Sequence, residues 1–246
     1  MLDKPSADQA GYEQSLRHHR TQKAAECILD LAFAAKQPGS VVDVGCGVGT
    51  WLSTARQKGA KEVLGLDSPD VPLSSLQISR DEFIACNLAS PPNLKRRFDF
   101  AISLEVAEHL PPECGERFAA YLCDLAPTIL FSAAIPHQTG NHHINLRSQS
   151  YWVEQFAKAG KTCLDIIRPR VWNCEYVPYW YAQNAFVFSD DAEVTAHFKD
   201  EAVTALTLLN VVHPELLDMY ARQVARRSAK GLFSSLRRHA TKHGGG

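Results

Sequence analysis

The feature that most constrains the fold is a strand-like run that ends in closely spaced glycines. Residues 41–51 read VVDVGCGVGTW, so that Gly45, Gly47 and Gly49 directly follow a β-branched stretch. A residue without a Cβ atom permits a tight turn and the close approach of a ligand to the backbone. The next residues, TWLSTARQKG, predict a helix whose first N–H groups and positive dipole end face that turn. This order of strand, turn and helix predicts a ligand site at the end of the first strand.

Further apolar runs of strand length follow the turn and alternate with helical patterns, apart from the last two, which an aromatic segment joins. Strands that alternate with helices form βαβ units and a parallel sheet with helices on both faces. The fold class expected is α/β, with a doubly wound, mostly parallel seven-stranded sheet, an antiparallel edge hairpin, and helical N-terminal and C-terminal extensions. The strands are expected at 41–45, 62–67, 82–88, 98–105, 128–136, 163–169 and 184–190, and helices at 12–36, 50–59, 113–125 and 148–160.

Three parts of the chain are expected. Residues 1–37 form a helical cap, residues 38–190 form the α/β domain, and residues 191–246 form a helical extension with a basic tail. From Ala221 onward the chain has seven Arg or Lys residues and no Asp or Glu. A solvated terminal helix is the favoured interpretation of this tail, and an amphipathic segment that contacts an anionic membrane surface is the alternative.

Composition excludes several classes of protein. The chain of 246 residues has a formal net charge of −1, which argues against nucleic acid as a partner. Its seven cysteines form no CxxC pair, and neither a leader sequence nor an apolar run of bilayer length is evident. We therefore expect reduced thiols and a cytoplasmic location. The sequence leaves the oligomeric state open.

The glycine spacing distinguishes between two kinds of cofactor. A turn that holds the pyrophosphate of a dinucleotide has the pattern GxGxxG, whereas this chain has GCGVG and carries Asp43 two residues before the first glycine. An acid at that position suits a cofactor with an ammonium group and suits a pyrophosphate badly. The spacing and the acid both disfavour NAD.

The stretch DVGCGVGTW resembles motif I of the class I S-adenosylmethionine-dependent methyltransferases, which have a Rossmann-like fold, and the resemblance extends over residues 38–190. An acid at the end of the second strand holds the ribose in that family, and the SLEVAEHL stretch resembles its motif at the fourth strand. Where the family often has an acid after the third strand, this chain has Asn87, whose amide oxygen can also accept from adenine. The resemblance implies S-adenosyl-L-methionine as cofactor, held by Asp43, Gly45, Cys46, Gly47, Gly49, Asp67, Asn87, Leu88, Leu104 and Glu105.

The loop after the fifth strand reads AIPHQTGNHHINLRSQSYW and is similar to that of small-molecule and sugar O-methyltransferases. By this resemblance His143 and Asn145 are the candidate catalytic residues, with His143 as the general base for a hydroxyl. The alternative is that His143 only braces the loop. A metal site from His137, His142 and His143 is not expected, because the loop spacing is not diagnostic and no acid cluster is evident nearby.

Two further segments have open interpretations. Residues 171–184 contain five aromatic side chains, which form either a lid for the acceptor or the packing of the edge hairpin. By the same family resemblance, residues 11–20 are expected to fold over the cofactor and reach its carboxylate through Tyr12, Arg17 or His19.

The function expected is methyl transfer to a hydroxyl of a small molecule or saccharide in natural-product or glycan biosynthesis. N-methylation of a small-molecule amine and a non-catalytic cofactor-binding scaffold remain as alternatives. A nucleic-acid base as acceptor is not expected, since no NPPY-type motif follows the fourth strand. A protein arginine is not expected either, because the double-glutamate loop is missing.

Overall fold

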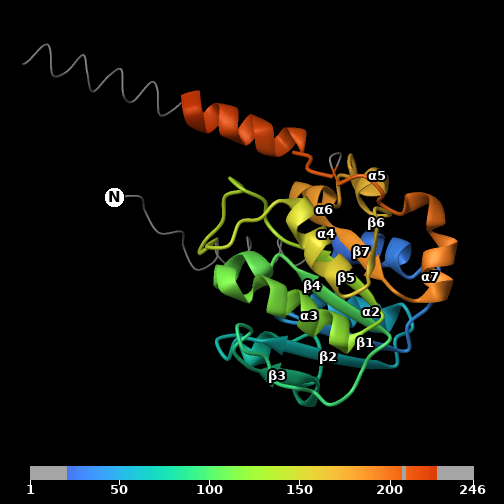
Figure 1. The fold of residues 1–246 in the computed structure, drawn as a ribbon. Coiled ribbons are helices and arrows are strands. Elements are labelled where there is room, and N and C mark those ends of the chain that lie inside the picture. The colour runs from blue at the N-terminus through green and yellow to red at the C-terminus, as the bar shows by residue number, and fades with distance from the viewer. Residues whose placement is uncertain (1–20, 207–208, 226–246) are drawn as a thin grey trace, which may run out of the picture. The chain divides into compact units, whose positions relative to one another are not determined.

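The computed structural model describes residues 21–206 and 209–225, which belong to two compact units that divide between Val211 and Val212. The first unit contains a seven-stranded sheet in the order β3-β2-β1-β4-β5-β7-β6 (Figure 1). Its strands are β1 (Ser40–Val44), β2 (Glu62–Asp67), β3 (Phe83–Ala85), β4 (Phe100–Leu104), β5 (Thr128–Ser132), β6 (Thr162–Leu164) and β7 (Phe186–Ser189). The seven-stranded α/β fold expected from the sequence is confirmed.

The first five strands are parallel, whereas β7 runs antiparallel to both β5 and β6. The chain moves outward from β1 to β2 and β3 on one side, and then returns to place β4 on the other side of β1. Ligands of open α/β sheets bind beyond the carboxyl ends of the strands where the order reverses in this way. The expected site therefore lies between the ends of β1 and β4.

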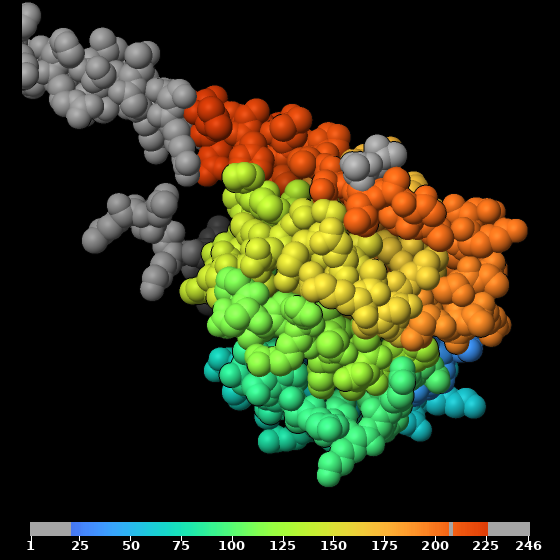
Figure 2. Space-filling view, viewed as in Figure 1, coloured from blue at the N-terminus to red at the C-terminus, as the bar shows by residue number. Residues whose placement is uncertain are grey.

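Helices cover both faces of the sheet (Figure 1). One face packs against α3 (Gly115–Leu125) and α4 (Gln149–Lys158), which form a continuous surface in Figure 2. The other face packs against a helix that includes residues 21–32 and against α2 (Thr50–Gln57). The other helices described in the first unit are α5 (Arg168–Val171), α6 (Tyr179–Asn184), α7 (Ala192–His197) and the 3₁₀ turns η1 (Leu73–Ser75), η2 (Arg80–Glu82), η3 (Ala107–His109), η4 (Pro112–Cys114) and η5 (Lys199–Glu201).

Side chains of β4 show how the strand sequence produces these two layers. Phe100 and Ile102 lie in the core with the helix of residues 21–32, whereas Ala101 lies in the core with α3. Successive side chains of a strand point to opposite faces, so a strand with helices on both sides needs an uninterrupted apolar run. The apolar run of the FDFAISLE stretch meets that requirement.

Two segments differ from the expected elements. The aromatic connection between β6 and β7 contains two short helices, α5 and α6, rather than a simple hairpin loop. The helical pattern expected after Asp190 ends with η5, and Ala202 forms a bridge to Leu164 at the open edge of β6. Covering a sheet edge satisfies backbone groups that solvent or another chain would otherwise pair. Tertiary pairing therefore interrupts the helix, which resumes at residues 214–225.

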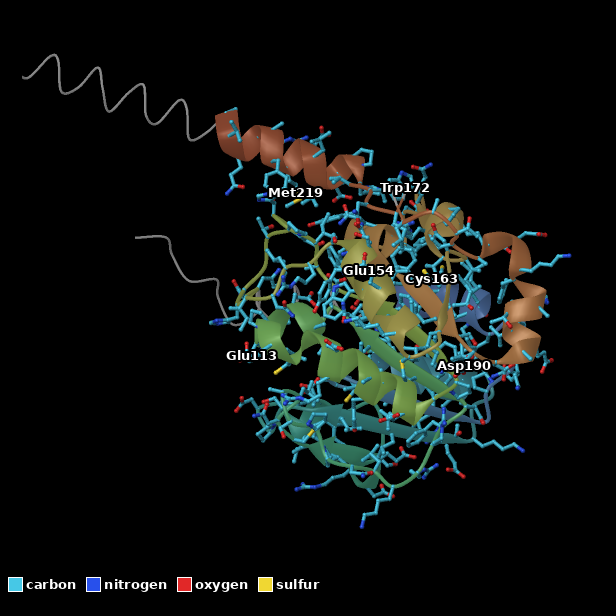
Figure 3. The ribbon with its side chains drawn as sticks, viewed as in Figure 1. Glu113, Glu154, Cys163, Trp172, Asp190 and Met219 are labelled. Atoms are coloured by element: carbon cyan, nitrogen blue, oxygen red, sulfur yellow. The ribbon has the colours of Figure 1, made fainter. Side chains whose placement is uncertain are left out.

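In the second unit the structure describes residues 212–225, of which 214–225 are helical. Most of the basic tail lies outside the described residues, so both interpretations of it stay predictions. Over the described ranges 21–206 and 209–225, no helix combines the length and apolar character needed to cross a bilayer. All seven cysteines are free thiols, and Cys163 lies buried on β6 (Figure 3).

A buried ammonium joins three segments at the edge of the sheet. The Lys161 side chain is 1% exposed, and its Nζ donates to the carbonyls of Ala126 and Pro127 at 3.0 and 2.9 Å. It also donates to Oδ1 of Asp190 at 2.7 Å (Figure 3 labels Asp190). All three N–H donors of this lysine are therefore satisfied.

Replacing Lys161 with methionine is expected to lower the free energy of unfolding by about 3 kcal/mol, because the buried Ala126 carbonyl and the Asp190 carboxylate lose a charged donor. The matched control is Lys158→Met, since Lys158 is 56% exposed and its ion pair with Glu116 spans 3.4 Å. Lys158→Met should lower the free energy of unfolding by no more than about 0.5 kcal/mol. Urea unfolding followed by tryptophan fluorescence measures both, and equal losses would contradict the stabilising role of Lys161.

Candidate active site

The glycine turn after β1 requires its glycines for two different reasons. Gly45 has φ +95°, and an ideal Cβ atom there would overlap Cγ2 of Val106. Gly47 has φ +54°, but no described atom lies within 4 Å of its ideal Cβ position. Gly45 therefore permits close packing of the turn, whereas the space beside Gly47 is open for a ligand. Gly49, also at positive φ, is the N-cap residue of α2.

This difference predicts unequal effects of two alanine substitutions. Gly45→Ala should lower the free energy of unfolding by about 3 kcal/mol, since strain at positive φ adds to the overlap with Val106. Gly47→Ala should lower it by about 1 kcal/mol, the cost of the left-handed conformation alone. Denaturant unfolding without ligand measures both values. Losses of the same size would contradict the assignment of Gly45 to packing and Gly47 to an open ligand surface.

Two cavities lie on either side of Gly45, which lines both. The larger, of about 520 Å³, extends from the end of β2 across the β3 loop to the end of β4. The smaller, of about 320 Å³, lies over the glycine turn and the start of α2. Of the residues expected to hold the cofactor, the larger cavity contains Asp67, Asn87, Leu88 and Glu105, and the smaller contains Asp43, Cys46, Gly47 and Leu104.

Asp67 ends β2 with its carboxylate held by the backbone. Oδ2 accepts from the Gly47 N–H at 2.6 Å, and Oδ1 accepts from the Ser68 N–H at 2.6 Å. A carboxylate has about four lone-pair sites, so each oxygen retains capacity for a further donor. The group is therefore fixed at the cavity wall and can accept from two neighbouring hydroxyls of a ribose.

Asp43 is the buried acid of β1. Asp43 is 2% exposed. Burial, together with the charge of Asp67, raises the pKa of the Asp43 carboxyl well above its usual value. A bound cationic group in the adjoining cavity would stabilise the ionised form. This arrangement suits the ammonium group of a methionine-type ligand.

Cys46 and Asn87 have contacts that qualify their expected roles. The Sγ atom of Cys46 packs against Gly65 on β2, where an added Cβ would meet it, and burial raises the pKa of the thiol. Cys46 therefore fills space under the turn as well as lining the cavity. Asn87 is exposed on the larger cavity, and its Oδ1 accepts from the Ala89 N–H at 2.9 Å. Its role as an acceptor for adenine stays a prediction.

Glu105 lies directly after β4 in a strained conformation, with φ +55°. Its carboxylate accepts from Nε2 of Gln138 at 2.8 Å and from Nδ2 of Asn184 at 3.4 Å, and burial raises its pKa to about 7. A non-glycine residue at positive φ persists only where its surroundings hold it, which is typical of functional sites. Sequence reasoning did not identify the two amide partners, because they come from the β5 loop and from α6.

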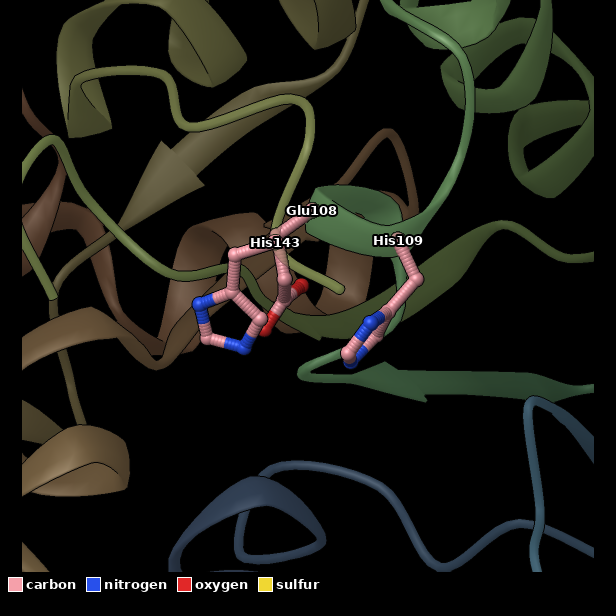
Figure 4. Close-up of side chains that lie close together, drawn as sticks. All are labelled: Glu108, His109 and His143. Carbon is pink, nitrogen blue, oxygen red and sulfur yellow. The ribbon is translucent and has the colours of Figure 1, made fainter. Parts of the chain in front are cut away.

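Three side chains form a cluster beside the segment that follows Glu105 (Figure 4). Glu108 and His109 come from η3, and His143 comes from the loop after β5. Glu108 is 0% exposed, and neither carboxylate oxygen has a hydrogen-bond partner among the described residues. Burial, and secondly the charge of Glu105, raises the pKa of Glu108 to about 9. The rings of His109 and His143 meet edge to face, with centroids 4.9 Å apart.

The two histidines of this cluster are suited to act as neutral bases or ligands. Partial desolvation and the neighbouring His143 lower the pKa of His109, which remains exposed. Nδ1 of His143 lies 3.3 Å from the Gln138 carbonyl oxygen, which can only accept, so Nδ1 carries the proton. In the neutral ring, Nε2 of His143 then has the lone pair.

Asn145 holds the histidine loop in place. It is 2% exposed, its Nδ2 donates to the Ala107 carbonyl at 3.0 Å, and its Oδ1 accepts from Nε of Arg147 at 2.9 Å. The Asn145 N–H also donates to the Glu108 carbonyl at 3.0 Å. The amide is thus occupied in positioning the loop, and these contacts do not favour the catalytic role predicted from the sequence. His142 and His137 are exposed on the same loop.

The aromatic segment divides between the two expected roles. Tyr181 is 9% exposed, lines the smaller cavity and meets Trp51 edge to face with centroids 5.4 Å apart. Tyr179 is buried in packing, whereas Tyr176 is exposed. One ring of the segment is therefore a cavity wall. The expected contact of residues 11–20 with the cofactor lies outside the described residues.

Comparisons with known proteins agree with this geometry. Residues 16–124 match the family model of a methyltransferase domain. The fold is similar to that of DesVI from Streptomyces venezuelae, with a TM-score of 0.58, 15% identity, and coverage of 77% of this chain and 100% of that chain. It is also similar to the human N-acetylserotonin methyltransferase in complex with S-adenosylmethionine, with a TM-score of 0.50 and 11% identity. This match covers 72% of this chain and 54% of that chain.

A third similar structure is CalO1, a methyltransferase in calicheamicin biosynthesis with S-adenosylhomocysteine bound, with a TM-score of 0.50, 14% identity, and coverage of 76% and 59%. No curated protein matches the sequence significantly. The matched family model, the strand order and the open glycine turn agree with the resemblance of the DVGCGVGTW motif. Residues 16–124 therefore match a methyltransferase domain, and the fold is that of the class I, S-adenosylmethionine-dependent methyltransferases.

Proposed function

We propose that this protein transfers the methyl group of S-adenosylmethionine to a hydroxyl of a small molecule or saccharide. The observation that carries the proposal is the cluster of proton-accepting groups beside the larger cavity. His109 lines that cavity, and His143 packs against His109 with its Nε2 free to accept a proton. A hydroxyl must lose a proton when it is methylated, whereas an amine needs only to be positioned. The cluster therefore favours a hydroxyl acceptor over an amine.

The residues around the two cavities have distinct parts in this reaction. Asp43 would pair with the ammonium group of the cofactor, Asp67 with its ribose hydroxyls, and Leu104 with its methionine side. When bound, the cofactor would supply a methyl carbon activated by its sulfonium, with S-adenosylhomocysteine as the leaving group. Nε2 of His143 would accept the proton that the acceptor hydroxyl loses as its oxygen takes the methyl group. The walls of the site hold the two reactants in line.

Two properties of the site argue against a non-catalytic scaffold. The turn at Gly47 is open among the described residues, and Glu105 is held at positive φ beside the cavity. Two of the similar structures, an N-acetylserotonin methyltransferase and a methyltransferase in calicheamicin biosynthesis, also support a small-molecule acceptor. A formal charge of −1 supports neither DNA nor RNA as partner, and the reduced thiols are consistent with the cytoplasm as the expected location.

Paired acceptors test the proposal. The purified protein is incubated with S-adenosylmethionine and with matched compounds that differ only in a hydroxyl or an amine, such as a sugar phenyl glycoside and its amino-sugar analogue. Release of S-adenosylhomocysteine is followed by mass spectrometry, together with the mass of the methylated product. We expect turnover with members of the hydroxyl series. Turnover confined to the amines would overturn O-methylation, and cofactor binding without turnover on any acceptor would favour the scaffold.

A further inference from the structure

We propose that Glu108, His109 and His143 form a binding site for a first-row divalent cation such as Mn²⁺, Fe²⁺ or Zn²⁺. One ligand atom from each of the three side chains lies within 4.8 Å of the others. Figure 4 shows the three side chains together, with Glu108 and His109 on η3 and His143 on the neighbouring loop. Cation binding itself needs no cofactor or acceptor, whereas its catalytic consequence rests on the function proposed above.

The unpartnered carboxylate of Glu108 is the second observation that points to a cation. Both of its oxygens are buried, and neither has a hydrogen-bond partner among the described residues. Buried polar groups are nearly always satisfied, and a buried carboxylate without a partner costs several kcal/mol in solvation. Glu105, a half-buried acid, lies close enough for its charge to act on Glu108. A bound cation would satisfy the carboxylate and offset the repulsion between the two acids.

The imidazoles are oriented as metal ligands usually are. A ligating histidine commonly donates its other ring N–H to a carbonyl or carboxylate, which fixes the tautomer and the ring orientation. His143 has this arrangement, with Nδ1 against the Gln138 carbonyl at 3.3 Å. His109 lies exposed at the larger cavity, so that an ion can enter from that side. The Asn145 N–H donates to the Glu108 carbonyl and thereby fastens the two ligand-bearing segments together.

The donor set selects among cations. Two imidazole nitrogens and one carboxylate oxygen suit Mn²⁺, Fe²⁺ and Zn²⁺, whereas Mg²⁺ and Ca²⁺ favour oxygen ligands. Three protein ligands leave positions open for an acceptor hydroxyl. Coordination lowers the pKa of that hydroxyl, so that its proton passes to solvent while the oxygen forms the bond to the methyl carbon. In this form of the reaction His143 is a ligand rather than the general base.

Titration of the EDTA-treated, desalted protein with Mn²⁺ tests the site without cofactor or acceptor. Free Mn²⁺ is measured by electron paramagnetic resonance, and ZnCl₂ is then added to displace the bound ion. We expect one site per chain in the micromolar range, with binding weakened at least about tenfold in Glu108→Gln and in His109→Asn. Glu113→Gln is the matched control, because Glu113 is an exposed acid of the next turn (Figure 3), and it should bind as the wild type does.

The Glu108→Gln protein could lose cation binding because a buried substitution disturbs its fold. His109→Asn changes an exposed ligand and therefore tests the site without that risk. Calorimetric titration with S-adenosylhomocysteine shows whether each variant retains the fold and the cofactor site. The inference is overturned if the wild type binds neither Mn²⁺ nor Zn²⁺, or if both ligand variants bind like the wild type. Methyl transfer that continues at full rate in EDTA would overturn the catalytic role of the cation and leave the proposed function intact. Site-specific cation binding without any methyl transfer would instead uphold the site and overturn the proposed function.

Discussion

Replacing Asp67 with alanine is expected to weaken S-adenosylhomocysteine binding about 100- to 1,000-fold. The carboxylate would accept from two ribose hydroxyls, and a charge-assisted hydrogen bond contributes about 1.5–3 kcal/mol. Two bonds near the lower end of that range contribute about 3–4 kcal/mol together, which corresponds to this loss of affinity. The same carboxylate holds the Gly47 N–H at 2.6 Å, so its loss also loosens the turn against which the cofactor lies. Isothermal titration calorimetry of the purified protein measures the change.

Two further variants separate the loss of ribose contacts from a general disturbance. Asp70→Ala removes an exposed acid of the same loop that lines neither cavity, and it should leave the affinity unchanged. Asp67→Asn retains one acceptor oxygen and should have an intermediate effect. An Asp67→Ala protein that binds S-adenosylhomocysteine within about threefold of the wild type, less than one charge-assisted hydrogen bond is worth, would show that the cofactor does not use this acid.

The second large effect is expected at His143. His143→Ala should lower turnover on a hydroxyl acceptor about 100- to 10,000-fold, the range of a lost proton acceptor. The affinity for S-adenosylhomocysteine should stay nearly constant, because His143 lines neither of the two cavities that flank Gly45. The loss is expected whether the residue takes the proton itself or binds a cation that activates the hydroxyl. Initial rates at saturating cofactor, together with calorimetry, measure both quantities.

His142 provides the matched control for this prediction. It is the neighbouring exposed histidine with φ +58°, a conformation that asparagine tolerates. His142→Asn should therefore retain turnover within about threefold, since substitutions of exposed residues that make no buried contact usually change the stability of a protein little. If His143→Ala retained wild-type turnover, His143 would be a brace for the loop, the alternative left open by the sequence.

The sheet and the glycine turn could be predicted from the sequence because their causes are local. A continuous apolar run such as residues 129–131 of β5 is what a strand covered on both faces requires. The turn has a similarly local requirement, since Gly45 and Gly47 occupy positive φ values that side chains disfavour. The order of strands and helices then limits the topology to a doubly wound sheet. These patterns also locate Asp43 and Asp67 at the carboxyl ends of adjacent strands.

The same reasoning failed where long-range pairing overrides local preference. A helical pattern continues past Asp190, yet Val203 donates its N–H to the Cys163 carbonyl at 2.9 Å and covers the edge of β6. The aromatic segment after α5 likewise becomes helical in α6, and its Tyr181 packs on Trp51 of α2. Neither contact follows from the spacing of the residues involved.

The sequence by itself determined the fold class, the cofactor turn and the acids at the ends of β1 and β2, because periodicity and backbone conformation are properties of short segments. Only the tertiary structure brought Glu108 and His109 against His143, and only it assigned the amide of Asn145 to holding the loop. The reason is that β4 and β5 pair in parallel, so that the loops leaving them converge at one edge of the sheet. Chemistry that depends on this convergence has no signal in either loop alone.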